Sequence, residues 1–82
     1  MDFGLLWFDD GKRPVQEKLR GAAEAYQARF RRKPDTVYVH TSDYAQLARE
    51  LGQERPRRAA GLSVVACINI LPCYFWIGRD EE

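Results

Sequence analysis

The apolar positions of this chain follow two spacings, one typical of β-strands and the other typical of α-helices. Short runs rich in aromatic and β-branched residues predict four strands, at residues 3–8, 36–40, 62–67 and 73–77, and each run begins or ends beside a Gly, Pro or Asp. Apolar residues three and four positions apart predict two helices, at residues 14–33 and 42–51. The predicted order is therefore β-α-β-α-β-β.

Both predicted helices have start and stop signals. Pro14 suits the first turn of the first helix, where a backbone N–H has no partner within the helix, and Pro34 ends it. The second helix is expected to follow a Thr41 or Ser42 cap and to end at Gly52. The apolar stripe of the first helix consists of Val15, Leu19, Ala22, Ala23, Tyr26 and Phe30.

The connections between these elements predict a mixed sheet whose strand order the sequence leaves open. A helical crossover joins the first two strands, so we expect them to run parallel. The last two strands are separated only by a turn at residues 68–72, so we expect them to run antiparallel. Residues 1–82 are thus predicted to form a single α/β domain, an α+β two-layer sandwich with four strands and two helices on one face.

The predicted strands are apolar on both faces, which is more than two helices on one side can cover. The uncovered face is expected to carry Leu6, Phe8, Tyr38, Val65, Tyr74 and Trp76. Such a patch exceeds the few hundred Å² that a monomer usually exposes, and aromatic side chains are typical of interface cores. We therefore expect a homodimer or a higher homo-oligomer through this face. The alternative is that the helices flank the sheet on opposite sides, which would bury every strand.

Composition and charge narrow the class of protein without naming an activity. Hydrophobic residues make up 45% and charged residues 30% of the 82 residues, which is a globular composition, and the net charge of +1 favours no particular partner. The longest apolar run, residues 62–77, is interrupted and too short for a membrane span, and no leader segment is visible. Cys67 and Cys73 form no disulfide framework, so we expect a cytoplasmic protein with reduced thiols and no membrane partner.

One candidate site consists of Asp9 and Asp10 after the first strand and His40 after the second. If these strands were parallel neighbours, the three side chains would meet at the carboxyl edge of the sheet. Ligands of open α/β sheets usually bind at that edge. Two carboxylates and an imidazole could then hold a divalent metal or act as acid and base. The alternative is structural, because Asp-Asp-Gly is a common turn and His40 ends a strand.

A second candidate is a nucleic-acid surface. Two basic clusters could neutralise phosphates: Arg29, Arg31, Arg32 and Lys33, and Arg55, Arg57 and Arg58. The near-zero net charge and the lack of a nucleic-acid module signature favour the alternative, a helix C-terminus and a solvated loop.

The remaining motifs argue against a named chemistry. A C-x5-C pair with one distant His is not a zinc pattern, and the chain has no nucleophile or phosphate-loop motif. We expect no cofactor and no metal. The preferred hypothesis is a non-catalytic, self-associating scaffold or accessory subunit. A nucleic-acid-associated protein is the first alternative, and a small metal-dependent enzyme is the second.

Two stretches resemble known proteins. Residues 32–47 (R-K-P-D-T-V-Y-V-H-T-S-D-Y-A-Q-L) and 61–78 (G-L-S-V-V…I-L-P…F-W-I-G) are similar to the strand–helix–strand portion of tailed-phage major capsid proteins and encapsulin shells. The chain departs from that pattern, since it is shorter and since His40 and Ser63 stand where prolines are expected. Residues 23–34 (A-x-x-Y-x-x-R-F-x-x-x-P) resemble short uncharacterised bacterial proteins. Both resemblances imply an α/β fold and self-association.

Overall fold

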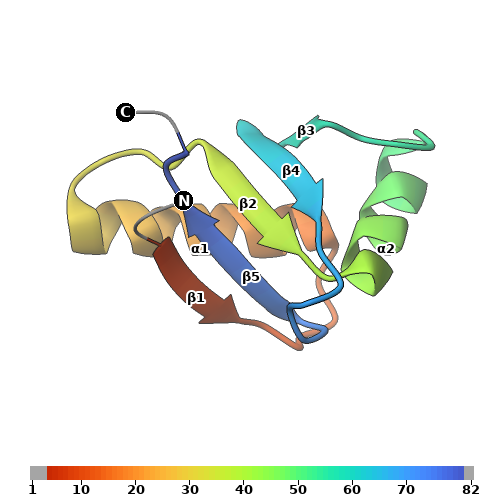
Figure 1. Ribbon diagram of the computed structural model, residues 1–82, viewed down its shortest axis with the longest axis horizontal. Coiled ribbons are helices and arrows are strands. Elements are labelled where there is room, and N and C mark those ends of the chain that lie inside the picture. Colours follow the sequence, from red (N-terminus) through yellow and green to blue (C-terminus); the bar gives the residue numbers. More distant parts are fainter. Residues whose placement is uncertain (1–3, 81–82) are drawn as a thin grey trace.

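The computed structural model describes residues 4–80, which form a five-stranded mixed sheet and two helices (Figure 1). The elements are β1 (Gly4–Phe8), α1 (Val15–Phe30), β2 (Thr36–Val39), α2 (Thr41–Leu51), β3 (Arg58–Ala59), β4 (Leu62–Ala66) and β5 (Tyr74–Gly78). The chain is therefore of the expected α+β class, with one strand more than the predicted four. Phe3, the predicted start of the first strand, lies outside the described residues.

The additional strand, β3, is part of a tight hairpin with β4. Ala59 lies opposite Leu62, and the two residues between them, Ala60 and Gly61, have φ angles of 53° and 78°. Two consecutive positive φ angles define the primed turn that suits a two-residue hairpin. The usual signal for this turn is Asn-Gly, so an alanine in the first position concealed it in the sequence.

The strand order, β1-β5-β2-β4-β3, places β5 in the interior of the sheet, between β1 and β2. β5 pairs antiparallel with both β1 and β2, while β2 pairs parallel with β4. The expected directions are thus present: β1 runs parallel to β2, and β4 runs antiparallel to β5. Neither pair is adjacent, however, because β5 lies between β1 and β2, and β2 lies between β5 and β4. β5 carries two fully buried side chains, Phe75 and Ile77, as expected for a strand that has neighbours on both sides.

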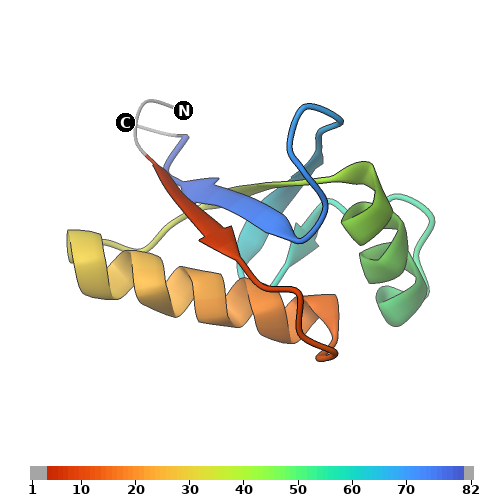
Figure 2. The same ribbon diagram turned by 90° about the horizontal axis from the view of Figure 1, so that it is seen from below.

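The helices leave one face of the sheet without a helical cover. α1 runs beneath the sheet, and α2 packs against the end of α1 on the side of β4 (Figures 1 and 2). The opposite face carries no helix in the part of the chain that the structure describes (Figure 2). This is the arrangement expected from the sequence, and the alternative with helices on both faces does not occur.

The core lies between α1 and the helix-facing side of the strands. It consists of buried side chains from every layer: Val15, Leu19, Ala22, Tyr26, Val37, Val39, Leu47, Ala59, Leu62, Val64, Phe75 and Ile77. Burial of a large apolar side chain contributes roughly 1.5–3 kcal/mol, so this layer supplies most of the driving force for folding. The alternating strand residues therefore point to the uncovered face.

Three local features differ from the prediction: the end of α1, the cap of α2 and the burial of the loop before β3. α1 ends at Phe30 rather than at residue 33, because Arg31 adopts a left-handed conformation and its N–H bonds to the Gln27 carbonyl at 2.8 Å. The residue that caps α2 is His40 rather than Thr41 or Ser42. The loop before β3 was expected to be exposed and mobile, but Pro56 is fully buried and its carbonyl accepts a 2.7 Å hydrogen bond from the Tyr44 hydroxyl.

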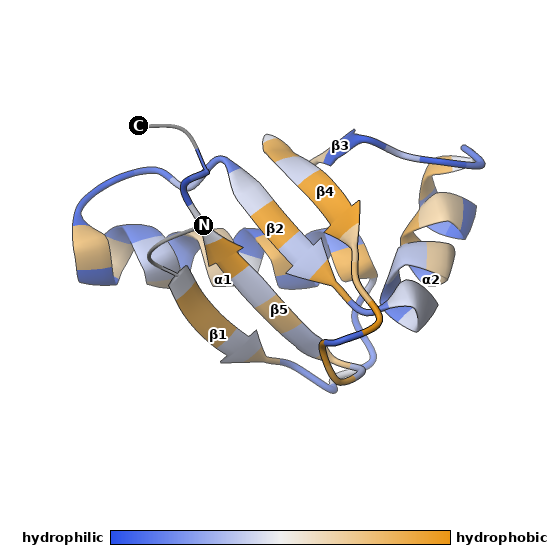
Figure 3. Cartoon of the chain, viewed as in Figure 1, coloured by the Kyte–Doolittle hydropathy of each residue, from blue (hydrophilic) through white to orange (hydrophobic). Residues whose placement is uncertain are grey.

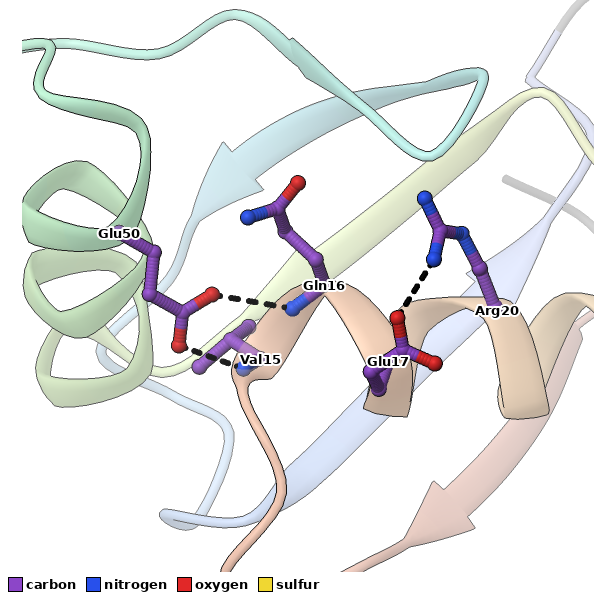
Figure 4. A network of polar contacts seen from close by, with 5 residues as sticks. All are labelled: Val15, Gln16, Glu17, Arg20 and Glu50. Atoms are coloured by element: carbon purple, nitrogen blue, oxygen red, sulfur yellow. Dashed lines mark hydrogen bonds and ion pairs between the residues drawn. The ribbon is translucent and has the colours of Figure 1, made fainter.

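The N-terminus of α1 depends on a side chain from the other helix. Pro14 provides no side-chain cap. Instead, the Glu50 carboxylate of α2 accepts hydrogen bonds from the N–H groups of Val15 and Gln16, at 2.6 and 3.2 Å (Figure 4). A carboxylate is favoured there because it satisfies free N–H groups and faces the positive end of the helix dipole. Glu50 thereby fixes the angle between the two helices.

Candidate functional site

An apolar row crosses the face that no helix covers. Leu6 lies opposite Trp76, Trp76 opposite Tyr38, and Tyr38 opposite Val65, so four strands contribute one residue each at the same level. Leu6 is 52% exposed and Val65 is 39% exposed. Tyr38 and Trp76, in the middle of the row, are partly buried. Their sequence neighbours Leu5, Val37, Val64 and Ile77 belong to or pack on the core, which confirms that the row is on the other side of the sheet.

Aromatic side chains widen this row on both sides, in the direction of the strands. Phe8, which is 52% exposed, packs on Tyr74 with ring centroids 4.8 Å apart. The Trp76 indole lies over Gly4, since a Cβ atom on Gly4 would come within 2.9 Å of two indole carbons. The residue type at Gly4 therefore permits the flat placement of Trp76 on the sheet. Residues Leu6, Phe8, Tyr38, Val65, Tyr74 and Trp76, together with Ile68 and Leu71, are called the open face below.

Ile68 and Leu71 belong to the loop of residues 67–73, which rises from the sheet on the side of the open face (Figure 2). They are 76% and 67% exposed, the highest values among the large apolar side chains of the described chain. Both ends of the loop are held: the Cys67 N–H bonds to the Val39 carbonyl at 2.7 Å, and the Cys73 N–H bonds to the buried Asp43 carboxylate at 2.8 Å. Both hydrogen bonds are at the base of the loop, and its apolar tip is exposed.

Sequence reasoning assigned these residues to a turn and missed their role in the surface. The available signal was the apolar composition of residues 68–71, Ile-Asn-Ile-Leu, where turns are usually polar. Figure 3 shows the contrast with the hydrophilic loops of residues 31–35 and 53–57.

A polar pocket borders the open face where β2 and β4 begin. Its volume is about 330 Å³, and it is lined by Asp35, Thr36, Arg58, Ser63, Val65 and Asp80. The lining side chains bond to one another and to nearby backbone: Arg58 donates to the Ser63 hydroxyl at 3.3 Å, and the Thr36 hydroxyl and the Asp80 N–H each donate to Asp35 at 2.8 Å. The pocket therefore gives the open face a polar border that contains both signs of charge.

The predicted cluster of Asp9, Asp10 and His40 does not form. β5 separates β1 from β2, so the condition that the two strands be neighbours is not met. Asp9 accepts hydrogen bonds from the Gly11 N–H at 2.9 Å and from Arg13 at 2.8 Å, and these two contacts lower its pKa. Asp10 is exposed. Within residues 4–80, no three His, Cys, Asp or Glu side chains gather closely enough to hold a metal ion.

His40 has a structural role at the start of α2. Its Nδ1 atom accepts a 3.0 Å hydrogen bond from the Ser42 N–H and lies 2.9 Å from the Ser42 hydroxyl. This contact satisfies one of the free N–H groups of the first helical turn. The imidazole faces the helix backbone rather than a partner carboxylate.

Most of the two basic clusters lie in different parts of the molecule, although Arg58 lines the same pocket as Asp35. Arg29 is in the last turn of α1 with its guanidinium 5.8 Å from the Phe30 ring, and Arg31, Arg32 and Lys33 follow the helix. Arg55 and Arg57 belong to the loop after α2, at the far end of α1, and Arg58 lies in β3 (Figure 1). The structure thus provides no single basic surface that combines them.

No family model, curated protein or solved structure matches the chain. The local resemblance to capsid and encapsulin proteins therefore stays a prediction, and the functional argument depends on the geometry of the site. Among the described residues, neither helix has the length and the apolar composition needed to cross a membrane. Cys67 and Cys73 are both free and partly buried thiols.

The open face exposes a large apolar area. A fully exposed large side chain presents on the order of 150–200 Å². At the exposed fractions of Leu6, Phe8, Val65, Ile68 and Leu71, these five residues alone expose roughly 500 Å² of apolar surface. The largest apolar patch on a typical monomer covers about 300–600 Å² and is often functional, so the open face is a candidate functional surface.

Proposed function

We propose that this chain is a non-catalytic module that associates with a second copy of itself through the open face, and that it serves as a scaffold or accessory subunit. The observation that carries the proposal is the apolar row Leu6–Trp76–Tyr38–Val65, which crosses four strands without a helical cover. It is continued by two exposed apolar residues at the loop tip, Ile68 and Leu71.

The size of the open face fits one half of a standard interface. Such interfaces bury about 800 Å² on each partner, of which about 56–65% is apolar. The apolar part is then on the order of 500 Å², which is the amount that the open face exposes. The aromatic content and the lack of charge in the row are also typical of an interface core, and the mixed charges of the pocket suit its rim.

The shape of the open face favours a second copy as the partner. The loop of residues 67–73 rises at one end of β2 and β4, and the polar pocket is at the other end of the same two strands. A two-fold axis along the apolar row reverses the strand direction and places the loop of each copy over the pocket of the other. Such a contact is isologous, because it joins the same surface of both copies. The sheets would stack about 10 Å apart.

Sedimentation velocity between about 1 and 200 µM tests the proposal. We expect the chain to sediment above the monomer mass. We also expect Val65→Lys to raise the dissociation constant of the open-face contact at least tenfold, because the two-fold axis along the row would bring the two lysine charges together in the interface. Ala28→Lys is the matched control, since it adds the same charge on an exposed position of α1 and should leave association unchanged. A wild-type chain that stays monomeric over this range would falsify the proposal.

The alternatives inferred from the sequence stay predictions. Binding of nucleic acid by the basic clusters, and metal-dependent catalysis at Asp9, Asp10 and His40, have no supporting contact in the described residues, so we develop neither further.

A further inference from the structure

The two borders of the sheet differ in how they are protected. One border is β3, which has only two residues, one of them the charged Arg58. The other border is β1, whose five residues Gly-Leu-Leu-Trp-Phe contain no charge, no proline and no positive φ angle (Figure 1). Natural edge strands are usually shortened, charged or bulged, because an unprotected edge recruits another strand. Among residues 4–80, no strand pairs with the outer side of β1.

Hydrogen bonding to β5 determines which backbone groups of β1 point outward. The Asp9 N–H bonds to the carbonyl of Cys73 at 2.9 Å, and these residues are directly opposite in the register that pairs Phe8 with Tyr74. In an antiparallel pair, hydrogen-bonded and non-hydrogen-bonded positions alternate. Leu5 and Trp7 therefore bond to β5, whereas the N–H and C=O groups of Gly4, Leu6 and Phe8 point to the outer edge.

We propose that this edge pairs with β1 of a second copy, antiparallel and centred on Leu6, so that Leu6 lies opposite Leu6 of the other copy and Gly4 lies opposite Phe8. This register uses every outward N–H and C=O group of the strand, because all three pairs are hydrogen-bonded positions. A register shifted by one residue would place the outward groups of one copy against residues whose groups point inward.

The side chains agree with this register. The Leu6 pair joins the apolar rows of the two copies into one row across both sheets. Each Phe8 comes opposite a Gly4 of the other copy, beside the Trp76 indole that lies over Gly4, so the two aromatic rings can pack against each other. The contact deepens the proposed self-association but uses a different surface. Its two-fold axis is perpendicular to the sheet and to the axis of the open-face contact, so the two contacts are compatible in a tetramer with D2 symmetry.

Cysteine cross-linking tests the register directly, in a Cys67→Ser, Cys73→Ser background. In the proposed pairing, Leu6→Cys places two cysteines about 5.5 Å apart between Cα atoms, within the range for a disulfide. Phe8→Cys is the matched control, since Phe8 has the same 52% exposure but the two cysteines would be separated by about 13 Å along the strands. We expect Leu6→Cys to form covalent dimers in a glutathione redox buffer at least tenfold faster than Phe8→Cys.

Two further measurements separate this contact from the open-face contact. Addition of Val65→Lys to the Leu6→Cys chain should leave the cross-linking rate within about twofold, because Val65 is on β4, far from the edge. In the wild-type chain, hydrogen exchange should show concentration-dependent protection of the Leu6 and Phe8 amides, whereas Leu5 and Trp7 are protected at all concentrations. Equal cross-linking of the two cysteine variants, or rapid exchange at Leu6 and Phe8 in a chain that sediments as an oligomer, would overturn the edge pairing and leave the open-face proposal intact.

Discussion

The contact between Glu50 and the start of α1 yields the sharpest quantitative prediction for stability. Glu50 accepts two backbone hydrogen bonds that no residue of α1 itself can replace, because Pro14 precedes the helix and provides no side-chain cap. The helix that it caps contributes Val15, Leu19, Ala22 and Tyr26 to the core. Loss of the cap therefore affects the element on which most of the packing depends.

The expected magnitude follows from the two bonds. A hydrogen bond to a charged group contributes about 1.5–3 kcal/mol, and loss of an N-cap costs about 0.5–2 kcal/mol. Because Glu50 is partly exposed and water can solvate the released N–H groups, we expect Glu50→Ala to lower the free energy of unfolding by about 2 kcal/mol. Glu50→Gln, which keeps an acceptor oxygen but removes the charge, should cost about 1 kcal/mol.

Urea denaturation monitored by circular dichroism, at one fixed protein concentration, measures this effect. The concentration must be fixed because association of folded chains adds to the apparent stability. Glu54→Ala is the control, since Glu54 is exposed in the loop after α2, and it should change the free energy of unfolding by less than about 0.5 kcal/mol. If Glu50→Ala has an effect as small as Glu54→Ala, the inter-helix cap does not stabilise the fold and the reasoning is refuted.

Two other substitutions test local features of the fold. Ala60→Asn should raise the free energy of unfolding by about 0.5–1 kcal/mol, because asparagine tolerates the left-handed conformation at φ 53° better than alanine. Ala60→Val should lower the free energy of unfolding. The urea midpoints of the three chains test this, and an unchanged or reversed order would contradict the assigned turn. Asp9→Asn should destabilise the chain at neutral pH, because the Arg13 and Gly11 hydrogen bonds lower the pKa of Asp9 in the folded state. A lowered folded-state pKa gives stability that is complete above the ordinary pKa range of Asp and is lost as the pH falls through the folded-state pKa. The urea midpoints of the two chains should therefore converge near pH 2. A difference that persists there would argue against the ion pair.

The sequence predicted those features that depend on local periodicity. Alternation along the strands correctly grouped Val37, Val39, Phe75 and Ile77 on one face, and Leu6, Phe8 and Val65 on the other. Which of the two faces the helices cover was left open. The surplus of apolar strand surface was visible for the same reason. The period of two in a strand determines which residues share a face, whatever the order of the strands.

Features that depend on contacts distant in sequence were not predictable in this way. The insertion of β5 between β1 and β2 depends on which strand edges are satisfied, and this decided that Asp9 and His40 are not neighbours. The cap provided by Glu50 joins residues 35 positions apart. The apolar loop tip was missed because the position of Ile68 and Leu71 beside the open face depends on the direction in which the loop leaves the sheet.

The most direct test of the central claim is a half-filtered NOE experiment on a sample that mixes isotope-labelled and unlabelled chains. If two copies associate through the open face, intermolecular NOEs should connect the Val65 methyl groups with the Tyr38 ring protons of the other copy, and the Leu71 methyl groups with the Val65 methyl groups of the other copy, which line the pocket beneath the loop. None should involve Ala28 on the outer side of α1. Intermolecular NOEs confined to α1, or none at the open face at a concentration where the chain sediments as an oligomer, would contradict the account.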